Sequence, residues 1–180
     1  LERAGWNDFE KRAAEARSRG KVRGIGLSTY VEACAFAGSE PAFVELQSDG
    51  SFILKIGTQS NGQGHATAYA QLAAEKLGID YSKIALHQGD TDELAKGGGT
   101  GGSRSVPLGG VSVVRASDAL ADKLKKLASD KLEAAAGDIE LADGEARIAG
   151  TDRSISFADL AAAAPSPDDI KAEGNFQQAE

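Results

Sequence analysis

Glycine is concentrated in two short segments of this 180-residue chain, residues 60–65 and 97–105, and this constrains the fold more than any other feature of the sequence. Each segment stands directly before a stretch with helical periodicity. Glycine adopts backbone conformations that other residues avoid, and it leaves no Cβ in the path of a ligand. We therefore expect two loops at strand-to-helix junctions that together bind an anionic ligand through backbone and hydroxyl groups.

Hydrophobic periodicity predicts helices, and two Asp-Gly pairs predict hairpins. Apolar residues recur at helical spacing in 8–19, 64–77, 107–136 and 157–164. Asp49-Gly50 separates strands predicted at 42–47 and 51–57, and Asp143-Gly144 separates strands predicted at 139–141 and 145–149. Further strands are expected at 22–36, at 83–87 and around Ile170. Residues 88–105 have no periodicity, which indicates a long loop.

The order of these elements predicts an α+β fold, in which helices pack on a mixed sheet with β-hairpins. The expected organisation is an N-terminal helix in 1–20 followed by a region 21–180, with 21–136 and 137–180 as candidate lobes. Methionine is absent from the chain, even at position 1. We therefore expect this sequence to be a segment of a longer protein.

The composition argues against several classes of partner. A formal net charge of −7 disfavours nucleic acid and anionic membranes, which attract clustered Lys and Arg. No apolar run approaches the ~20 residues of a membrane span, and residues 1–20 are too charged for a signal peptide. The single cysteine, Cys34, excludes an internal disulfide and fits a reducing, cytoplasmic compartment. Its expected place is in the core.

The first glycine-rich loop has the sequence Gly57-Thr58-Gln59-Ser60-Asn61-Gly62-Gln63-Gly64-His65. A helix that starts here presents unpaired N–H groups to an anion, and the Gln63 amide can both donate and accept hydrogen bonds. A tight turn with Asn61 as the helix cap explains the same pattern equally well. The spacing differs from the Gly-x-Gly-x-x-Gly of a dinucleotide-binding fold.

The second loop has the sequence Gly97-Gly98-Gly99-Thr100-Gly101-Gly102-Ser103-Arg104-Ser105. Its hydroxyl groups can bind a ligand, and Arg104 supplies a permanently charged fork suited to phosphate. A flexible, solvated linker is the alternative interpretation, although such a linker has little use for an arginine between serines. A Walker A loop is excluded because no Gly-Lys-Ser/Thr follows.

Several motifs follow one another in order along residues 6–136: Gly24-Ile25-Gly26-x-x-x-Tyr30-x-Glu32, Gly62-Gln63-Gly64-His65-x-Thr67, Gly89-Asp90-Thr91-Asp92 and Gly99-Thr100-Gly101-Gly102-Ser103-Arg104-Ser105. This ordered series resembles the molybdenum hydroxylase family. It is most similar to the molybdopterin-binding large subunit of xanthine dehydrogenase, aldehyde oxidase and carbon monoxide dehydrogenase-type enzymes.

The resemblance implies a molybdenum cofactor-binding domain that holds molybdopterin, in the cytosine dinucleotide form usual in bacterial members. Gln63 matches the glutamine near the molybdenum, and Arg104 matches an arginine of the bacterial members. The implied cofactor-binding residues are Gly62, Gln63, Gly64, His65, Thr100, Gly101, Gly102, Ser103, Arg104 and Ser105. The implied enzyme oxidises a small C–H or C=O substrate with water as oxygen source. Its other parts are the remainder of the large subunit and partner subunits with FAD and 2Fe-2S centres.

No catalytic residue or metal ligand is predicted in this chain. The family's catalytic glutamate lies in a downstream motif that has no match here, so the isolated segment is expected to be inactive. Asp90 and Asp92 are expected to form turns, His87 to be structural, and Glu32 to be a paired charge in the strand at 22–36. The open alternative is a non-catalytic domain whose glycine-rich loops bind another phosphorylated ligand or a partner subunit.

Overall fold

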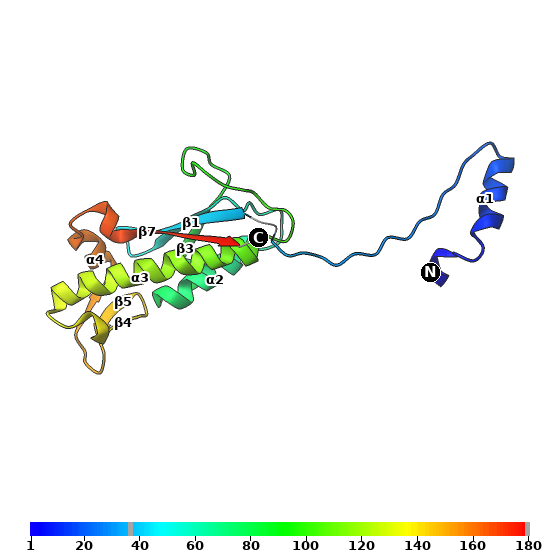
Figure 1. The fold of residues 1–180 in the computed structure, drawn as a ribbon. Coiled ribbons are helices and arrows are strands. Elements are labelled where there is room, and N and C mark those ends of the chain that lie inside the picture. The colour runs from blue at the N-terminus through cyan, green and yellow to red at the C-terminus, as the bar shows by residue number, and fades with distance from the viewer. Residues whose placement is uncertain (36–37, 179–180) are drawn as a thin grey trace. The chain divides into compact units, whose positions relative to one another are not determined.

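The computed structural model of the chain describes residues 1–35 and 38–178. They form two compact units, Leu1–Glu32 and Ala33–Glu180. The first unit holds helix α1, Phe9–Ser18, which buries Ala13 and Ala16. The second unit holds the other helices and strands labelled in Figure 1. Short 3-10 turns lie at Glu2–Ala4, Tyr81–Lys83, Ala136–Asp138 and Pro167–Ile170.

The strand predicted at 22–36 is wrong over the described part of that range, which belongs to no helix or strand; residue 36 itself lies outside the described residues. The large apolar side chains of this segment are exposed: Val22, Leu27, Tyr30 and Val31. A strand is stabilised by a neighbouring strand and by a face to pack against. Among the described residues no strand pairs with this segment, and only Ala35 at its end is buried, where its N–H donates to the Gly102 carbonyl at 3.0 Å. Cys34 and Glu32 are exposed for the same reason, so the expected core position of Cys34 is wrong.

The main sheet has four strands in the order β3-β2-β1-β7, with bounds Ile84–His87, Phe52–Ile56, Gly38–Leu46 and Lys171–Gln178. Strand β1 pairs antiparallel with β2 and β7, whereas β2 and β3 are parallel, so the sheet is mixed. Strand β1 starts at Gly38, earlier than the hydrophobic pattern indicated, because residues 38–41 pair with β7. Proline has no N–H to donate, and Pro41 lies beyond the end of the β1–β2 pairing at Ala42.

Both predicted hairpins are confirmed. Asp143 and Gly144 join β4, Ile139–Ala142, to β5, Glu145–Ile148, and both have positive φ, 56° and 83°. Positive φ at both central residues is the geometry of the two-residue turn that suits the twist of a hairpin. At the other hairpin the Ser51 N–H donates to Asp49 Oδ1 at 2.9 Å, and Gly50 has φ 81°. A third short strand, β6, Ser154–Ser156, completes a second sheet.

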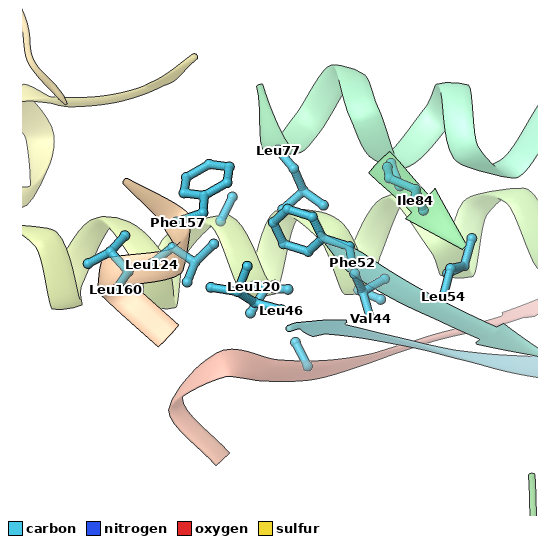
Figure 2. Close-up of a cluster of buried hydrophobic side chains, with 14 of the residues drawn as sticks. Val44, Leu46, Phe52, Leu54, Leu77, Ile84, Leu120, Leu124, Phe157 and Leu160 are labelled. Atoms are coloured by element: carbon cyan, nitrogen blue, oxygen red, sulfur yellow. The ribbon is translucent and has the colours of Figure 1, made fainter. Parts of the chain in front are cut away.

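Helices α2, His65–Leu77, and α3, Val111–Leu132, run side by side against the main sheet, as Figure 1 shows. A π-helical turn, Ser105–Gly110, leads into α3, and α4 spans Phe157–Ala163. The core lies between sheet and helices, where Phe52 and Phe157 meet edge to face with ring centroids 5.5 Å apart. Figure 2 shows the aliphatic side chains around them, from β1, β2, α2, β3, α3 and α4: Val44, Leu46, Leu54, Leu77, Ile84, Leu120, Leu124 and Leu160. The predicted α+β class with a mixed sheet is confirmed.

Candidate cofactor-binding site

The two glycine-rich loops line one pocket of about 310 Å³ at the starts of two helices. The first loop and α2 contribute Gln63, His65 and Ala68. The second loop and the turn that follows it contribute the rest of the lining: Thr100, Gly101, Ser103, Arg104, Ser105, Val106 and Pro107. Gly62, Gly64 and Gly102 belong to the same loops but stand outside the lining. The fold thus brings together two sequence segments that are far apart in the chain.

The first loop leaves the start of α2 open. Gly62 and Gly64 have φ of 101° and 80°, and no side chain caps the helix at Gly64. The interpretation of Asn61 as the helix cap is therefore wrong; its backbone N–H instead donates to Gln63 Oε1. No described atom lies within 4 Å of where a Cβ on Gly62 or Gly64 would stand. Uncapped N–H groups beside open space are the arrangement that binds anions at helix starts.

Behind the pocket, a buried hydrogen-bond network joins the two loops. The Tyr69 hydroxyl donates to the Ser105 carbonyl at 2.9 Å and lies 2.7 Å from Thr58 Oγ1. His65 Nδ1 lies 2.9 Å from the Thr58 carbonyl, and its ring lies against Tyr69. Burial raises the pKa of Tyr69 above its usual 10.0, against the opposing effect of the hydrogen bonds with Thr58 and Ser105. Tyr69 therefore remains a neutral donor at physiological pH.

We expect Tyr69→Phe to weaken the link between the two loops while leaving the core filled. The variant keeps the ring and removes the hydroxyl, so the buried Thr58 hydroxyl loses a partner, at a cost of about 1–3 kcal/mol. Denaturant unfolding of the complete subunit measures this loss. Tyr81→Phe is the matched control because Tyr81 is half exposed. An equal effect of the two substitutions would contradict the assigned role of Tyr69.

The second loop is bonded to the first through the hydroxyl group of Thr100. Thr100 Oγ1 donates to the Gln59 carbonyl at 2.6 Å and lies 3.2 Å from Ser105 Oγ. Ser103 has a positive φ of 55°, which is uncommon for a residue with a side chain. A segment with one such bond to the first loop and one within itself is not a free, solvated linker.

The Arg104 guanidinium points toward β1, where it meets Glu40. Its Nη1 lies 3.0 Å from Glu40 Oε2 and donates to the Gly99 carbonyl, and its Nη2 donates to the Ser39 carbonyl at 3.1 Å. The Glu40 side chain is fully buried and also accepts the Gly98 N–H at 2.8 Å. Sequence reasoning missed Glu40 because this residue lies before the strand predicted at 42–47, so nothing in the local pattern indicated that it is buried.

Two further glycines let the loops cross. A Cβ on Gly57 would stand 2.3 Å from the Gly97 Cα and 2.5 Å from Glu40 Oε1. A Cβ on Gly97 would stand 2.7 Å from the Gly57 Cα. Real Cβ atoms do not come this close to other atoms, so the crossing requires glycine at both positions. Neither residue is among the predicted binding residues.

The residues at the base of the long loop have structural roles. Asp90 accepts the Asp92 N–H at 2.8 Å, as expected for a turn. His87 Nδ1 lies 2.8 Å from Glu93 Oε2, and this hydrogen bond, together with the charge of Lys55, keeps the pKa of Glu93 below its ordinary 4.5. Within the described residues, no group of three or more His, Cys, Asp or Glu side chains is placed to hold a metal ion. No helix in that part of the chain is long and apolar enough to cross a bilayer.

The whole chain, residues 1–180, matches the family described as the molybdopterin cofactor-binding domain. The chain belongs to this family. Among curated proteins, the nicotine 6-hydroxylase large subunit of Paenarthrobacter nicotinovorans is 38% identical over 168 residues, which cover 86% of this chain and 21% of that protein. The carbon monoxide dehydrogenase large chain of Afipia carboxidovorans is 36% identical over 155 residues, 78% of this chain and 19% of that protein.

Solved structures show the same relationship for this molybdopterin cofactor-binding domain. Quinoline 2-oxidoreductase from Pseudomonas putida 86 superimposes with a TM-score of 0.70 at 29% identity, over 99% of this chain and 25% of that one. Reconstituted CO dehydrogenase from Oligotropha carboxidovorans gives a TM-score of 0.71 at 30% identity, over 98% of this chain and 25% of that one. The chain thus spans about a fifth of the length of the curated relatives it matches.

Proposed function

We propose that this domain holds molybdopterin in the pocket between its two glycine-rich loops, as part of a molybdenum hydroxylase. The complete enzyme would oxidise a C–H or C=O substrate with water as the source of oxygen. One observation carries the proposal: the two segments with the family's motifs line a single pocket at the starts of two helices. Anionic groups are stabilised at such helix starts.

The groups present in the pocket fit a large anionic cofactor. Thr100 and Ser105 offer hydroxyls and Gln63 offers an amide. The space beside Gly62, Gly64 and Gly101 is open, so a ligand can approach their backbone N–H groups. The proposed binding set is the predicted one except for Arg104, whose guanidinium bonds to Glu40: Gly62, Gln63, Gly64, His65, Thr100, Gly101, Gly102, Ser103 and Ser105. The bound cofactor would supply the redox chemistry, and these residues would orient it.

The finer features of the enzyme belong to the same proposal. The cofactor would be the cytosine dinucleotide form, and partner subunits would carry the FAD and 2Fe-2S centres. The similarity to proteins named as the large subunit or large chain of such enzymes supports a multi-subunit assembly. The catalytic base would lie elsewhere in the large subunit, so this domain alone would hold cofactor without turnover. A single cysteine fits a cytoplasmic location.

The test is the molybdenum and pterin content of the complete large subunit carrying Gln63→Ala with Thr100→Val. Each substitution would remove about one cofactor hydrogen bond, worth about 0.5–1.5 kcal/mol. Thr100→Val would also remove the bond between Thr100 and the Gln59 carbonyl, so the double variant should bind cofactor more weakly by about tenfold or more. Gln177→Ala is the control, because Gln177 is exposed on β7 and outside the pocket. Equal cofactor content in all three proteins would contradict the proposal. It would favour a domain that binds another phosphorylated ligand.

A further inference from the structure

We propose that Glu40 is a positioning residue that holds the 97–105 loop in its binding conformation, and that Arg104 serves this role with it instead of contacting the cofactor's phosphate. This inference rests on the proposed function of the pocket. It assigns a role to a residue outside the family motifs noted in the sequence. It also changes the expected role of Arg104 from ligand contact to internal counter-ion.

The geometry shows how one carboxylate fixes the second loop. Glu40 Oε2 accepts hydrogen bonds from the Gly98 N–H at 2.8 Å and from Arg104 Nη1 at 3.0 Å. Arg104 Nη1 also donates to the Gly99 carbonyl of the same loop at 3.0 Å. The loop is therefore attached to β1 near both of its ends, and Glu40 is the common point.

The same carboxylate lies against the first loop. Glu40 Oε1 stands 2.5 Å from the position of a Cβ on Gly57 and 3.6 Å from that of a Cβ on Gly97. This oxygen is buried and has no hydrogen-bond partner among the described residues. Glu40 therefore sits where the two loops cross, and a displacement of its side chain would reach both of them.

A gain in overall stability does not explain this ion pair. Removing two charges from water costs about as much as their attraction returns, so a buried pair adds little net stability. What it does supply is a fixed geometry, because any loop conformation that separates the partners leaves a buried charge unpaired. The β1 strand gives Glu40 a rigid support, since it is paired with β7 at Phe176.

Arg104 is occupied by these contacts. Its side chain is 16% exposed, and its guanidinium bonds to Glu40 and to the carbonyls of Gly99 and Ser39. The charge that would attract a phosphate is therefore balanced inside the protein. Backbone N–H groups and hydroxyls of the loop would then bind the anion.

Hydrogen exchange of the complete large subunit without cofactor tests this role, with wild type, Glu40→Gln and the double variant Glu40→Gln/Arg104→Gln. We expect Glu40→Gln to speed exchange of amides 97–105 by about tenfold or more while amides of β2 stay protected. The double variant should recover protection, because two amides can pair and no buried charge is left over. Cofactor content of the same proteins should follow loop protection.

Asp143→Asn is the matched control because it removes the partner of Arg147 in an exposed ion pair. Two results would overturn the proposal: unchanged exchange at 97–105 in Glu40→Gln, or a loss of protection that extends equally through β2 and is not rescued by the double variant. If Glu40→Gln does not fold, Arg104→Lys replaces it, because lysine keeps the charge but lacks the forked guanidinium. This variant should also show faster exchange of amides 97–105 while the amides of β2 stay protected. The exchange measurement uses no cofactor, so it tests the role of Glu40 alone. The proposed function fails in a different experiment, if the pocket variants leave the cofactor content unchanged.

Discussion

Replacing Gly57 with alanine is expected to abolish cofactor binding by the complete subunit. The added methyl would stand 2.3 Å from the Gly97 Cα and 2.5 Å from Glu40 Oε1. The first neighbour is backbone and the second is a fully buried carboxylate, so neither can move aside cheaply. Inserting a methyl into such a packed site costs about 1–3 kcal/mol. Here the collision would be relieved by separation of the two loops, which would disrupt the pocket between them.

Molybdenum and pterin content, measured beside the thermal unfolding temperature, checks this expectation. Gly137→Ala is the matched control: it adds the same methyl where no described atom lies within 4 Å and where φ is not positive. We expect the control to keep wild-type cofactor content. A Gly57→Ala subunit with full cofactor would show that the loop crossing is not required for binding.

Gly174→Ala is expected to lower the free energy of unfolding, although Gly174 itself lies outside the pocket lining. Gly174 lies on β7, and a Cβ there would stand 2.3 Å from both the Ser112 carbonyl oxygen and the Ala116 nitrogen of α3. Because both neighbours are helix backbone, β7 would have to move off α3. That movement would also break the hydrogen bond from the Phe176 N–H to Ser112 Oγ.

Denaturant unfolding checks this second expectation, with a predicted loss of about 3 kcal/mol relative to wild type. Gly137→Ala again supplies the control, since the two variants share the same chemical change. The loss should extend to the pocket, because β7 pairs with the part of β1 that carries Glu40. A Gly174→Ala protein with unaltered stability would contradict the close approach of β7 and α3.

Much of the fold was predictable because its signals are local. Asp143-Gly144 specifies its own hairpin, since both residues adopt the positive φ that the turn demands. The period of apolar residues located α2 and α3, because one face of each helix packs on the sheet. The segment 22–36 shows the limit of such patterns. Its apolar residues are typical of a strand, yet a strand also requires a partner, which a local pattern does not reveal.

The sequence by itself determined the helices, the hairpins, the two glycine-rich loops and the family to which this chain belongs. Only the tertiary structure decided that the loops cross at Gly57 and Gly97, and that Arg104 is paired with Glu40. The physical reason is the range of the interactions. Helix and turn preferences depend on neighbours a few positions away. The partner of a buried charge depends on which distant segment the folded core brings beside it.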